Sequence, residues 1–501
     1  MKKINLGIGF GIIMISLCLF SGTGYAETYY VKNSGNDKSS GLDDKNAWRT
    51  IDKVNSFEFS AGDVVLFNRG DTFFDKLLLI KNLENFTIAD YGEGEKPLFD
   101  GNKIQPILIS DSKNVTVRNI DISGQEWKMD KGSNLYFKNV ESLIIDGVYG
   151  NGHTIKGKGK SEGKTAITIN ACSGIIEIKN CELLNWGPYD LPKTDTNDFM
   201  GIALYKMESG EYSIHNNKIY NINADCIQVY LTKEKGTIYK NVLYNAGEDS
   251  IDVKGSENVE IHDNEFYRTA DFLGEGGSGS GGLPTYIVVH EGGDLYSKNN
   301  TIRSNRFKDG DCIAIKLGKA EDTIVHDNSF SNVKSALYIQ NLVKNTLFHH
   351  NIIENPQSRL VLRDIDAGSI YENNSHTGTQ IYNNTIYNGE GNCKHLISLE
   401  CSKGTVIYNN IVYQNNASED ALGLYHNSCG DEPVISNNYW YNPNKINRNH
   451  YSKKIYTANM QKEWNEKHSG DKFDDPLMND PGDGDYSLYE KSLKWGAVYE
   501  K

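Results

Sequence analysis

The sequence predicts an all-β fold, a parallel β-helix built as a solenoid of coils of about 23 residues, over residues 77–441. Short runs of Ile, Val, Phe and Tyr, each followed by Asn, recur in this region without the 3.6-residue spacing of a helix. In one set of Asn residues the spacings are 24 and 23; this set is Asn217, Asn241 and Asn264. In a second set every spacing is 23; this set is Asn305, Asn328, Asn351 and Asn374. Leucine-rich repeats share this period but need a fixed Leu framework, which is missing, so β-branched and aromatic strands favour the β-helix. We expect the Asn residues to be structural, because Asn tolerates a left-handed backbone at a bend.

The first 26 residues have the pattern of a secretory signal. A basic start is followed by an apolar run from Leu6 to Phe20, and Gly24-Tyr-Ala26 resembles a cleavage site. We expect cleavage after Ala26. No later stretch reaches the ~18 apolar residues of a membrane-spanning helix. The sequence therefore predicts an exported protein, extracellular, periplasmic or at the cell surface, without a membrane span.

Non-repeating segments flank the solenoid. We expect residues 27–76 to cap its first coil, with a short helix over residues 51–57, and residues 442–501 to close its last coil. A repeating core needs atypical ends, because its terminal coils would otherwise expose apolar surface.

The charge of the chain disfavours nucleic acid as a partner. The sequence has 52 Lys and Arg against 66 Asp and Glu, a net charge of −14, and loss of Lys2 and Lys3 with the signal makes it −16. An acidic polysaccharide remains compatible with this charge where a bound divalent cation reverses the local sign. We expect the mature protein to be a monomer.

The eight cysteines give no recognisable framework. Cys18 lies in the signal, which leaves an odd number, and no CxxC motif occurs. Cys226 and Cys312 fall within strand patterns and are interpreted as small buried residues. Cys393 and Cys401 could form one disulfide in an oxidising compartment.

One strand pattern occurs four times and places polar residues on its outer face. The copies are Asp225–Tyr230, Asp249–Lys254, Thr285–His290 and Asp311–Lys316. Alternate side chains of a strand face opposite sides, so the Ile and Val positions are expected to point inwards. The last positions of the four copies should then form one outward column, namely Tyr230, Lys254, His290 and Lys316.

Four acidic residues on two consecutive copies predict a calcium site. Asp225 and Asp249 are 24 residues apart, so they should stack on adjacent coils at about 5 Å. Carboxylates that close repel one another unless one keeps its proton or a cation neutralises both. Glu248 and Asp252 add two further carboxylates, and Ca²⁺ prefers such oxygen ligands.

Two interruptions of the period predict loops near these acids. Asn264 and Asn305 are 41 residues apart, and the excess includes Gly274–Gly282, which we interpret as a flap over a substrate groove. Asn180 and Asn217 are 37 apart, so a second loop is expected around residues 186–197.

The strand-and-Asn pattern over residues 27–441 resembles the right-handed parallel β-helix of the pectate-lyase-like superfamily, and the segments Phe473–Leu477 and Gly484–Leu488 resemble a closing segment of such proteins. Asp225 followed by Glu248-Asp249-x-x-Asp252 is similar to the calcium site of family 9 polysaccharide (pectate) lyases. In that family a lysine on the next coil acts as the base.

The resemblance leaves the base open among three residues. His290 occupies the position one coil after Asp252, Lys316 resembles the lysine motif but lies a coil further on, and Lys254 lies beside the acids. A histidine titrates near neutrality, whereas a lysine base must be desolvated or placed near positive charge. Coil position favours His290, and motif resemblance favours Lys316.

The resemblance implies a secreted polysaccharide lyase acting on a uronic-acid-containing polysaccharide, pectate-like or alginate-like. The base would remove the proton at C5, while calcium, with Arg303 or Arg306, would neutralise the sugar carboxylate and stabilise the enolate-like intermediate. A uronan C5-epimerase would need almost the same site. A glycoside hydrolase and a non-catalytic carbohydrate-binding surface protein are also compatible with the fold, although the Asp-Pro-His-Asp and Asn-Thr-Asp motifs associated with alginate epimerases and polygalacturonases are absent.

Overall fold

A computed structural model describes residues 26–488 and residue 496, apart from 75, 102–103, 124–131, 153–163, 188–198, 270–283, 341, 358–359, 363–375, 391–392, 394, 401–402, 416–420, 428–430, 445–447 and 452. The predicted signal, the Gly274–Gly282 segment, most of the second loop and Cys401 lie outside the described residues, so the structure does not address those predictions. In the described part, no helix is long and apolar enough to cross a membrane.

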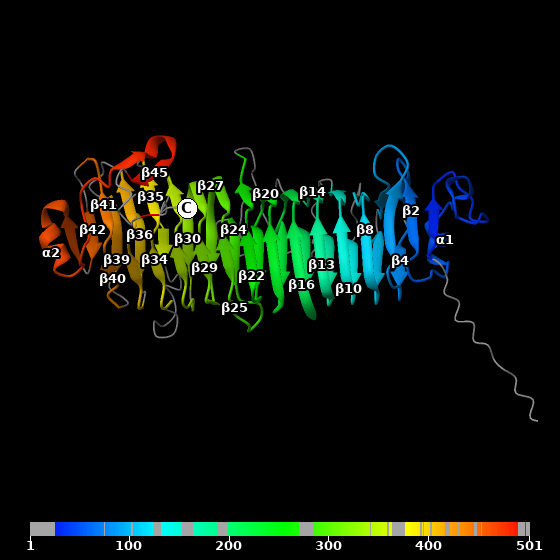
Figure 1. Cartoon of the computed structure of the whole chain (residues 1–501), viewed down its shortest axis with the longest axis horizontal. Helices are drawn as coiled ribbons and strands as arrows, with labels where there is room; N and C mark the ends of the chain where they lie inside the picture. The colour runs from blue at the N-terminus through cyan, green and yellow to red at the C-terminus, as the bar shows by residue number, and fades with distance from the viewer. Residues whose placement is uncertain are drawn as a thin grey trace, which may run out of the picture.

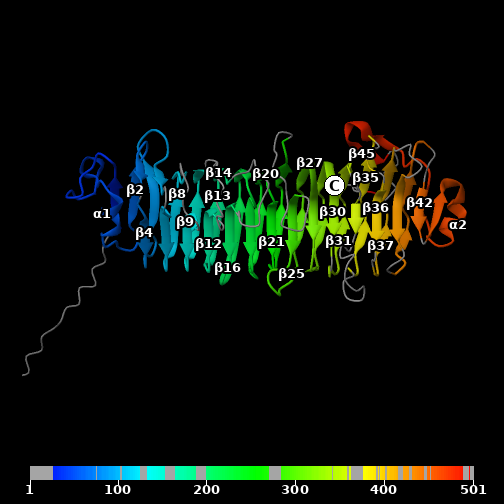
Figure 2. The same cartoon turned by 180° about the vertical axis from the view of Figure 1, so that it is seen from behind.

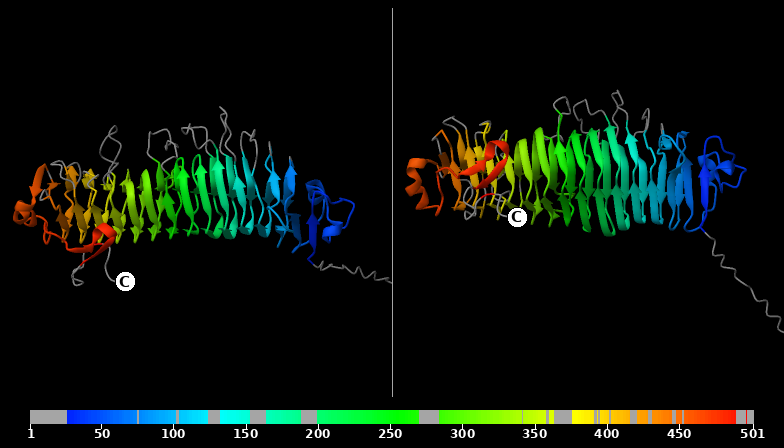
Figure 3. Two further views of the ribbon diagram at one scale, coloured as in Figure 1. Left: turned by 90° about the horizontal axis from the view of Figure 1, so that it is seen from above. Right: turned by 45° about the horizontal axis from the view of Figure 1, so that its top comes forward.

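The described strands stack as a parallel β-helix, which confirms the predicted all-β solenoid (Figure 1). Three parallel ladders run along the body, and the same arrangement is visible from behind (Figure 2). Views from above and from an oblique angle show the coils in succession from the N-terminal to the C-terminal end (Figure 3).

The first ladder is a 15-stranded sheet of strands that pair in parallel with the next coil. Its strands are β1 (Thr28–Val31), β2 (Val64–Asn68), β5 (Thr87–Tyr91), β8 (Lys113–Arg118), β10 (Glu141–Asp146), β13 (Ser173–Lys179), β16 (Ser209–His215), β19 (Lys235–Tyr239), β22 (Val259–His262), β26 (Thr301–Arg303), β29 (Ile324–His326), β31 (Leu347–His349), β34 (Gln380–Tyr382), β37 (Val406–Tyr408) and β40 (Val434–Ser436).

The other two ladders are joined into one 24-stranded sheet, because β27 (Arg306–Leu317) and β30 (Ser329–Ile339) belong to both. The sheet also includes β43 (Lys454–Thr457), which pairs antiparallel with the last strand of one ladder. The remaining strands of one ladder are β4 (Leu78–Lys81), β7 (Ile107–Ser110), β9 (Gly132–Lys138), β12 (Lys164–Asn170), β15 (Phe199–Tyr205), β18 (Ile227–Tyr230), β21 (Asp249–Lys254), β24 (Thr285–His290), β33 (Leu360–Leu362), β36 (His395–Glu400), β39 (Leu422–Asn427) and β42 (Arg448–Tyr451). Those of the other are β11 (Tyr149–Asn151), β14 (Glu182–Trp186), β17 (Lys218–Ile222), β20 (Val242–Ala246), β23 (Glu265–Tyr267), β32 (Ile352–Glu354), β35 (Thr385–Asn388), β38 (Ile411–Gln414) and β41 (Tyr439–Tyr441).

The ends of the solenoid carry the few helices of the described chain. At the N-terminal end lie η1 (Asp44–Asn46), α1 (Ile51–Asn55) and the strand pair β3 (Thr72–Phe74) and β6 (Leu98–Asp100). Helix α1 lies within the range predicted for the short helix, and its N-terminus is capped by Thr50, whose side chain accepts a hydrogen bond from the Lys53 amide at 3.1 Å.

At the other end, β43 (Lys454–Thr457), η2 (Ala458–Met460) and α2 (Gln461–Asn465) follow β42, and β44 (Met478–Asp480), η3 (Pro481–Asp483) and β45 (Asp485–Leu488) come last. The ladders begin at β1 and continue to β42, so coil pairing extends beyond residues 77–441 at both ends.

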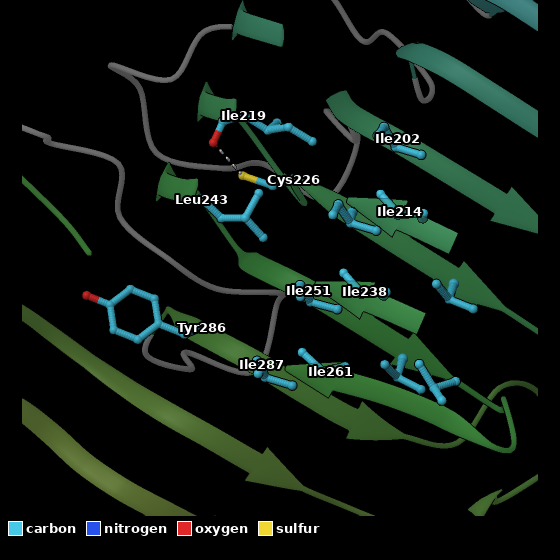
Figure 4. Packing of buried hydrophobic residues seen from close by; sticks show 14 of the residues in the cluster. Ile202, Ile214, Ile219, Cys226, Ile238, Leu243, Ile251, Ile261, Tyr286 and Ile287 are labelled. Atoms are coloured by element: carbon cyan, nitrogen blue, oxygen red, sulfur yellow. Dashed lines mark hydrogen bonds between the residues drawn. The ribbon is translucent and has the colours of Figure 1, made fainter. Parts of the chain in front are cut away.

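The interior is filled by aliphatic side chains stacked from coil to coil. Ile202, Ile227, Ile251, Ile287 and Ile315 occupy one row of paired strands, and each is fully buried. Figure 4 shows Ile202, Ile251 and Ile287 among their neighbours. Burying one such side chain contributes about 1.5–3 kcal/mol, so the row is a main source of stability.

A ladder of buried asparagines joins the coils at one bend. From the second member onward, each side-chain oxygen accepts from the backbone and side-chain amides of the asparagine one coil earlier. The members are Asn217, Asn241, Asn264, Asn305, Asn328, Asn351, Asn384, Asn410 and Asn438. This confirms the structural role of the predicted asparagines up to Asn351. The expected 23-residue step from Asn351 to Asn374 was wrong, because the next member after Asn351 is Asn384, 33 residues later; Asn374 itself lies outside the described residues. The left-handed residue is the one before each ladder asparagine, such as Asp263 or Asp327, so the bend needs the asparagine for its amide rather than for its backbone freedom.

Candidate functional site

The outer face of β18, β21, β24 and β27 brings together most of the predicted site residues. Pairing of these strands places Gln228, Asp252, Val288 and Lys316 in one outward row. Tyr230, Lys254 and His290 form the next row along the strands. The two rows lie side by side, the first over four consecutive coils and the second over the first three of them.

The predicted outward column was wrong for Lys316. Lys316 pairs with Val288 rather than His290, because Ile313, not Asp311, lies beside Thr285. The similarity of the segments that begin at Asp225 and Asp311 therefore suggested a register displaced by two residues. A count from the asparagine ladder would have given the observed register, since the inward Ile follows the ladder residue by ten positions in three coils: Asn217 and Ile227, Asn241 and Ile251, and Asn305 and Ile315.

Two buried carboxylates form the centre of the cluster. Asp225 and Asp252 are only 2% and 4% exposed. The Gln228 amide lies between them, and its Nε2 donates to Asp225 Oδ2 at 3.1 Å and to Asp252 Oδ2 at 3.0 Å. The backbone amide of Asp249 donates to Asp225 Oδ1 at 3.2 Å.

His290 is held against Asp252. Its Nε2 lies 3.0 Å from Asp252 Oδ1, and its Nδ1 lies 3.7 Å from Glu291 Oε2. Burial opposes protonation of His290, but the hydrogen bond with Asp252 and the interaction with Glu291 outweigh it and raise its pKa to about 9. Interaction with His290 lowers the pKa of Glu291 to about 2, and Lys319 Nζ contacts the same carboxylate at 2.8 Å. At neutral pH His290 is therefore a cation held between the carboxyl groups of Asp252 and Glu291.

Asp249 lies at the start of β21, one coil from Asp225. Burial, and then the charges of Asp225 and Asp252, raise the pKa of Asp249 well above its ordinary value, against the opposing charges of Lys316 and His290. This shift towards the protonated form is the direction expected when carboxylates stack on adjacent coils.

The remaining predicted residues lie at the edge of the cluster or away from it. Lys254 shares the row of His290. Glu248 lies in the turn before β21, where its backbone carbonyl accepts from the Thr285 amide at 3.0 Å. Arg303 lies on the 15-stranded sheet and pairs with Glu260 at 2.6 Å, and Arg306 is exposed in the part of β27 that pairs with β23. The structure does not bring either arginine to the cluster.

The oxygen atoms of the cluster decide whether it fits calcium. Among the described residues, no group of three or more His, Cys, Asp and Glu side chains is arranged to hold a metal ion. All four side-chain oxygens of Asp225 and Asp252 already contact nitrogen groups of Gln228, His290 and Asp249. Ca²⁺ takes six to eight oxygen ligands, so the arrangement as it stands does not fit that ion. Calcium binding by Asp225, Glu248, Asp249 and Asp252 stays a prediction from the sequence.

Sequence reasoning missed Gln228, Glu291 and Lys319. The alternation of side chains along its strand places Gln228 on the outer face, but this alone gives its amide no role. The available signal for Gln228 was its position one coil before Asp252 in the same pattern. Glu291 and Lys319 gave no such signal, because their contact depends on side chains from two different coils.

Residues 200–386, which contain the four strands of the cluster, match the family model described as right handed beta helix region. No curated protein matches the chain.

Three solved structures illustrate the likeness. The native GH136 lacto-N-biosidase from Eubacterium ramulus is 14% identical, with 85% of this chain and 68% of that one covered and a TM-score of 0.44. The alginate lyase from Paenibacillus sp. str. FPU-7 is 15% identical, with 56% and 92% covered and a TM-score of 0.42. The PL6 family alginate lyase AlyGC is 12% identical, with 94% and 56% covered and a TM-score of 0.49. At these identities and TM-scores none of them supports an inference about activity. The parallel ladders and the family match over residues 200–386 identify the chain as a right-handed parallel β-helix protein.

Proposed function

We propose that this chain is an exported polysaccharide lyase that cleaves an acidic, uronic-acid-containing polysaccharide by β-elimination. The observation that carries the proposal is the meeting of Asp225, Asp252, His290 and Lys316 on the outer face of adjacent coils. Charged side chains are rarely buried unless they are paired, and perturbed pKa values gather at functional sites.

The two outward rows suit a linear polymer. Successive coils are about 4.8 Å apart, close to the length of one sugar unit, so a chain lying along the axis would meet one row position per sugar. Tyr205 and Tyr230 lie on the N-terminal side of the cluster with ring centroids 6.0 Å apart, and they supply apolar surface for sugar rings.

Elimination requires a group that neutralises the sugar carboxylate, a base for the C5 proton and a donor for the leaving oxygen. His290 is a cation at neutral pH, so it suits the first role better than the role of base for which its position had favoured it. Lys316 and Lys254 are then the candidate bases, each after losing its own proton. Asp249, whose pKa is raised by burial and by Asp225 and Asp252, is the candidate proton donor for the leaving oxygen. The electrons of the C5–H bond form the C4–C5 double bond as the C4–O bond breaks.

The test is incubation of the purified chain with pectate, alginate and glycosaminoglycans while following the ultraviolet absorbance of an unsaturated uronyl product. On the correct polymer, Lys316→Ala or Lys254→Ala, whichever removes the base, should lower turnover by roughly 10²–10⁴-fold with little change in substrate binding. Lys235→Ala is the matched control, because Lys235 is exposed on the 15-stranded sheet. Near-normal elimination by Lys254→Ala, His290→Ala and Lys316→Ala alike would show that these rows are not the catalytic face.

One observation favours a glycoside hydrolase as the second candidate. Asp249, whose pKa is raised, lies beside Asp225, and such enzymes use a pair of carboxyl groups as their acid and base. Hydrolysis would produce reducing ends without the ultraviolet absorbance, and Asp249→Asn would abolish it. Inversion at C5 without chain cleavage would instead identify an epimerase.

A further inference from the structure

The amide of Gln228 occupies the position in the cluster where a cation was expected. Asp225 Oδ2 and Asp252 Oδ2 both accept from its Nε2, at 3.1 and 3.0 Å. An amide nitrogen carries two N–H groups, so one is available to each carboxylate. Gln228 is itself only 7% exposed, and little water reaches these bonds.

The orientation of this amide follows from its neighbours. An ionised carboxylate only accepts hydrogen bonds, so the opposite orientation would place the Gln228 carbonyl against two further acceptors. The outer oxygens are satisfied separately, Asp225 Oδ1 by the Asp249 backbone amide and Asp252 Oδ1 by His290 Nε2. Buried carboxylates need such donors or a metal ion, and here each oxygen has a protein donor.

We propose that Gln228 takes the place of a metal ion in this cluster, holding Asp225 and Asp252 together so that the site assembles without calcium. This inference does not rest on the proposed reaction, because it concerns the resting protein. It differs from the calcium site that the resemblance implied, and the difference lies in this one side chain. An oxygen ligand at position 228 would leave the carboxylates without a shared donor and in need of a cation.

Two substitutions of Gln228 test whether its N–H groups replace a metal ion. Gln228→Glu removes both N–H groups and adds a third carboxylate, which creates the oxygen-rich set that Ca²⁺ prefers. Gln228→Met removes the donors without adding charge. Gln414→Glu is the matched control, because Gln414 is also buried, at 3% exposure, and its Nε2 donates to the Cys393 carbonyl at 3.0 Å.

The experiment is calorimetric titration of calcium chloride into chelator-treated full chain, with thermal unfolding in calcium and in chelator. The wild type and Gln414→Glu should release no heat of binding and should melt at the same temperature in both conditions. Gln228→Glu should bind calcium and melt about 2–5 °C higher in calcium than in chelator. The melting temperature of Gln228→Met should also be higher in calcium than in chelator. This variant provides the test if Gln228→Glu does not fold.

Calcium binding by the wild type that disappears in Asp252→Asn would overturn the proposal. If the Gln228→Glu variant folds but does not bind calcium, the amide of Gln228 does not replace a cation in the cluster. No polysaccharide is present in either measurement, so the result stands apart from success or failure of the lyase assay.

Discussion

Replacing Asn328 with alanine would measure how much the asparagine ladder contributes to the solenoid. Asn328 is 2% exposed, and its Nδ2 donates to the carbonyls of Ile302 and His326, each at 2.9 Å, and to Asn351 Oδ1 at 3.0 Å. Its Oδ1 accepts from the backbone amide of Asn305 at 2.9 Å and from its side chain at 3.1 Å. One side chain therefore satisfies groups on the coils before and after it.

Alanine would leave the buried Asn305 amide and the Ile302 carbonyl without these partners. Each buried group left unsatisfied costs about 1–3 kcal/mol, and the void adds to this, so we expect Asn328→Ala to lower the free energy of unfolding by about 3–5 kcal/mol. Denaturant unfolding followed by circular dichroism measures the change. Asn444→Ala is the control, since Asn444 is exposed and a surface change is expected to stay within about 0.5 kcal/mol. Equal stability of the two variants would refute the reasoning, because the ladder would then contribute nothing.

Two further predictions concern stability. Burial lowers the pKa of His376 to about 4 from 6.5, so the unfolded chain binds more protons between these values, and stability should fall as the pH drops from about 6.5 to about 4. At about 1.36 kcal/mol per pKa unit, the wild type should lose about 3 kcal/mol more than His376→Gln over this range in denaturant titrations, and identical pH profiles would contradict the prediction. Gly236→Ala would place a Cβ 1.9 Å from the Tyr212 ring, so we expect a loss of about 1–3 kcal/mol in the same assay. Gly482→Ala, whose Cβ would meet nothing closer than 3.8 Å, is its control, and equal losses would contradict the clash.

The period of the solenoid could be predicted because each coil repeats the same physical demands. A buried asparagine must meet the next at the bend, and an inward Ile must meet the next in the core, so both recur at the coil length. The short helix at residues 51–55 and the inward rows follow from the same local rules. The burial of Cys226 and Cys312, at 0% and 1% exposure, also agrees with the sequence.

The site was only partly predictable, because its contacts join side chains from different coils. Alternation within a strand shows that Gln228, Asp252 and His290 face outwards. It does not show that the Gln228 amide lies between two carboxylates, or that His290 reaches back to Asp252 and not to Lys316. The predicted register of Lys316 was wrong because it followed the local resemblance of the segment that begins at Asp311. The number of residues from Asn305 to the inward Ile would have given the observed pairing.

The charge order along the outward rows of the site differs from that of a row outside it. Equivalent side chains on adjacent coils lie about 4.8 Å apart, so neighbours of like charge are unfavourable and neighbours of opposite charge are favourable. In one row outside the site, Lys298, Glu321 and Lys344 alternate in sign with contacts of 2.9 and 2.8 Å. Asp225 and Asp249 depart from this order, since two acids meet on adjacent coils and the pKa of Asp249 is raised. Such a departure is expected at a functional site, where the cost in stability is retained for the chemistry. The same reasoning explains why the neutral donor Gln228 precedes Asp252 in its row: an acid at that position would add a third like charge to the cluster.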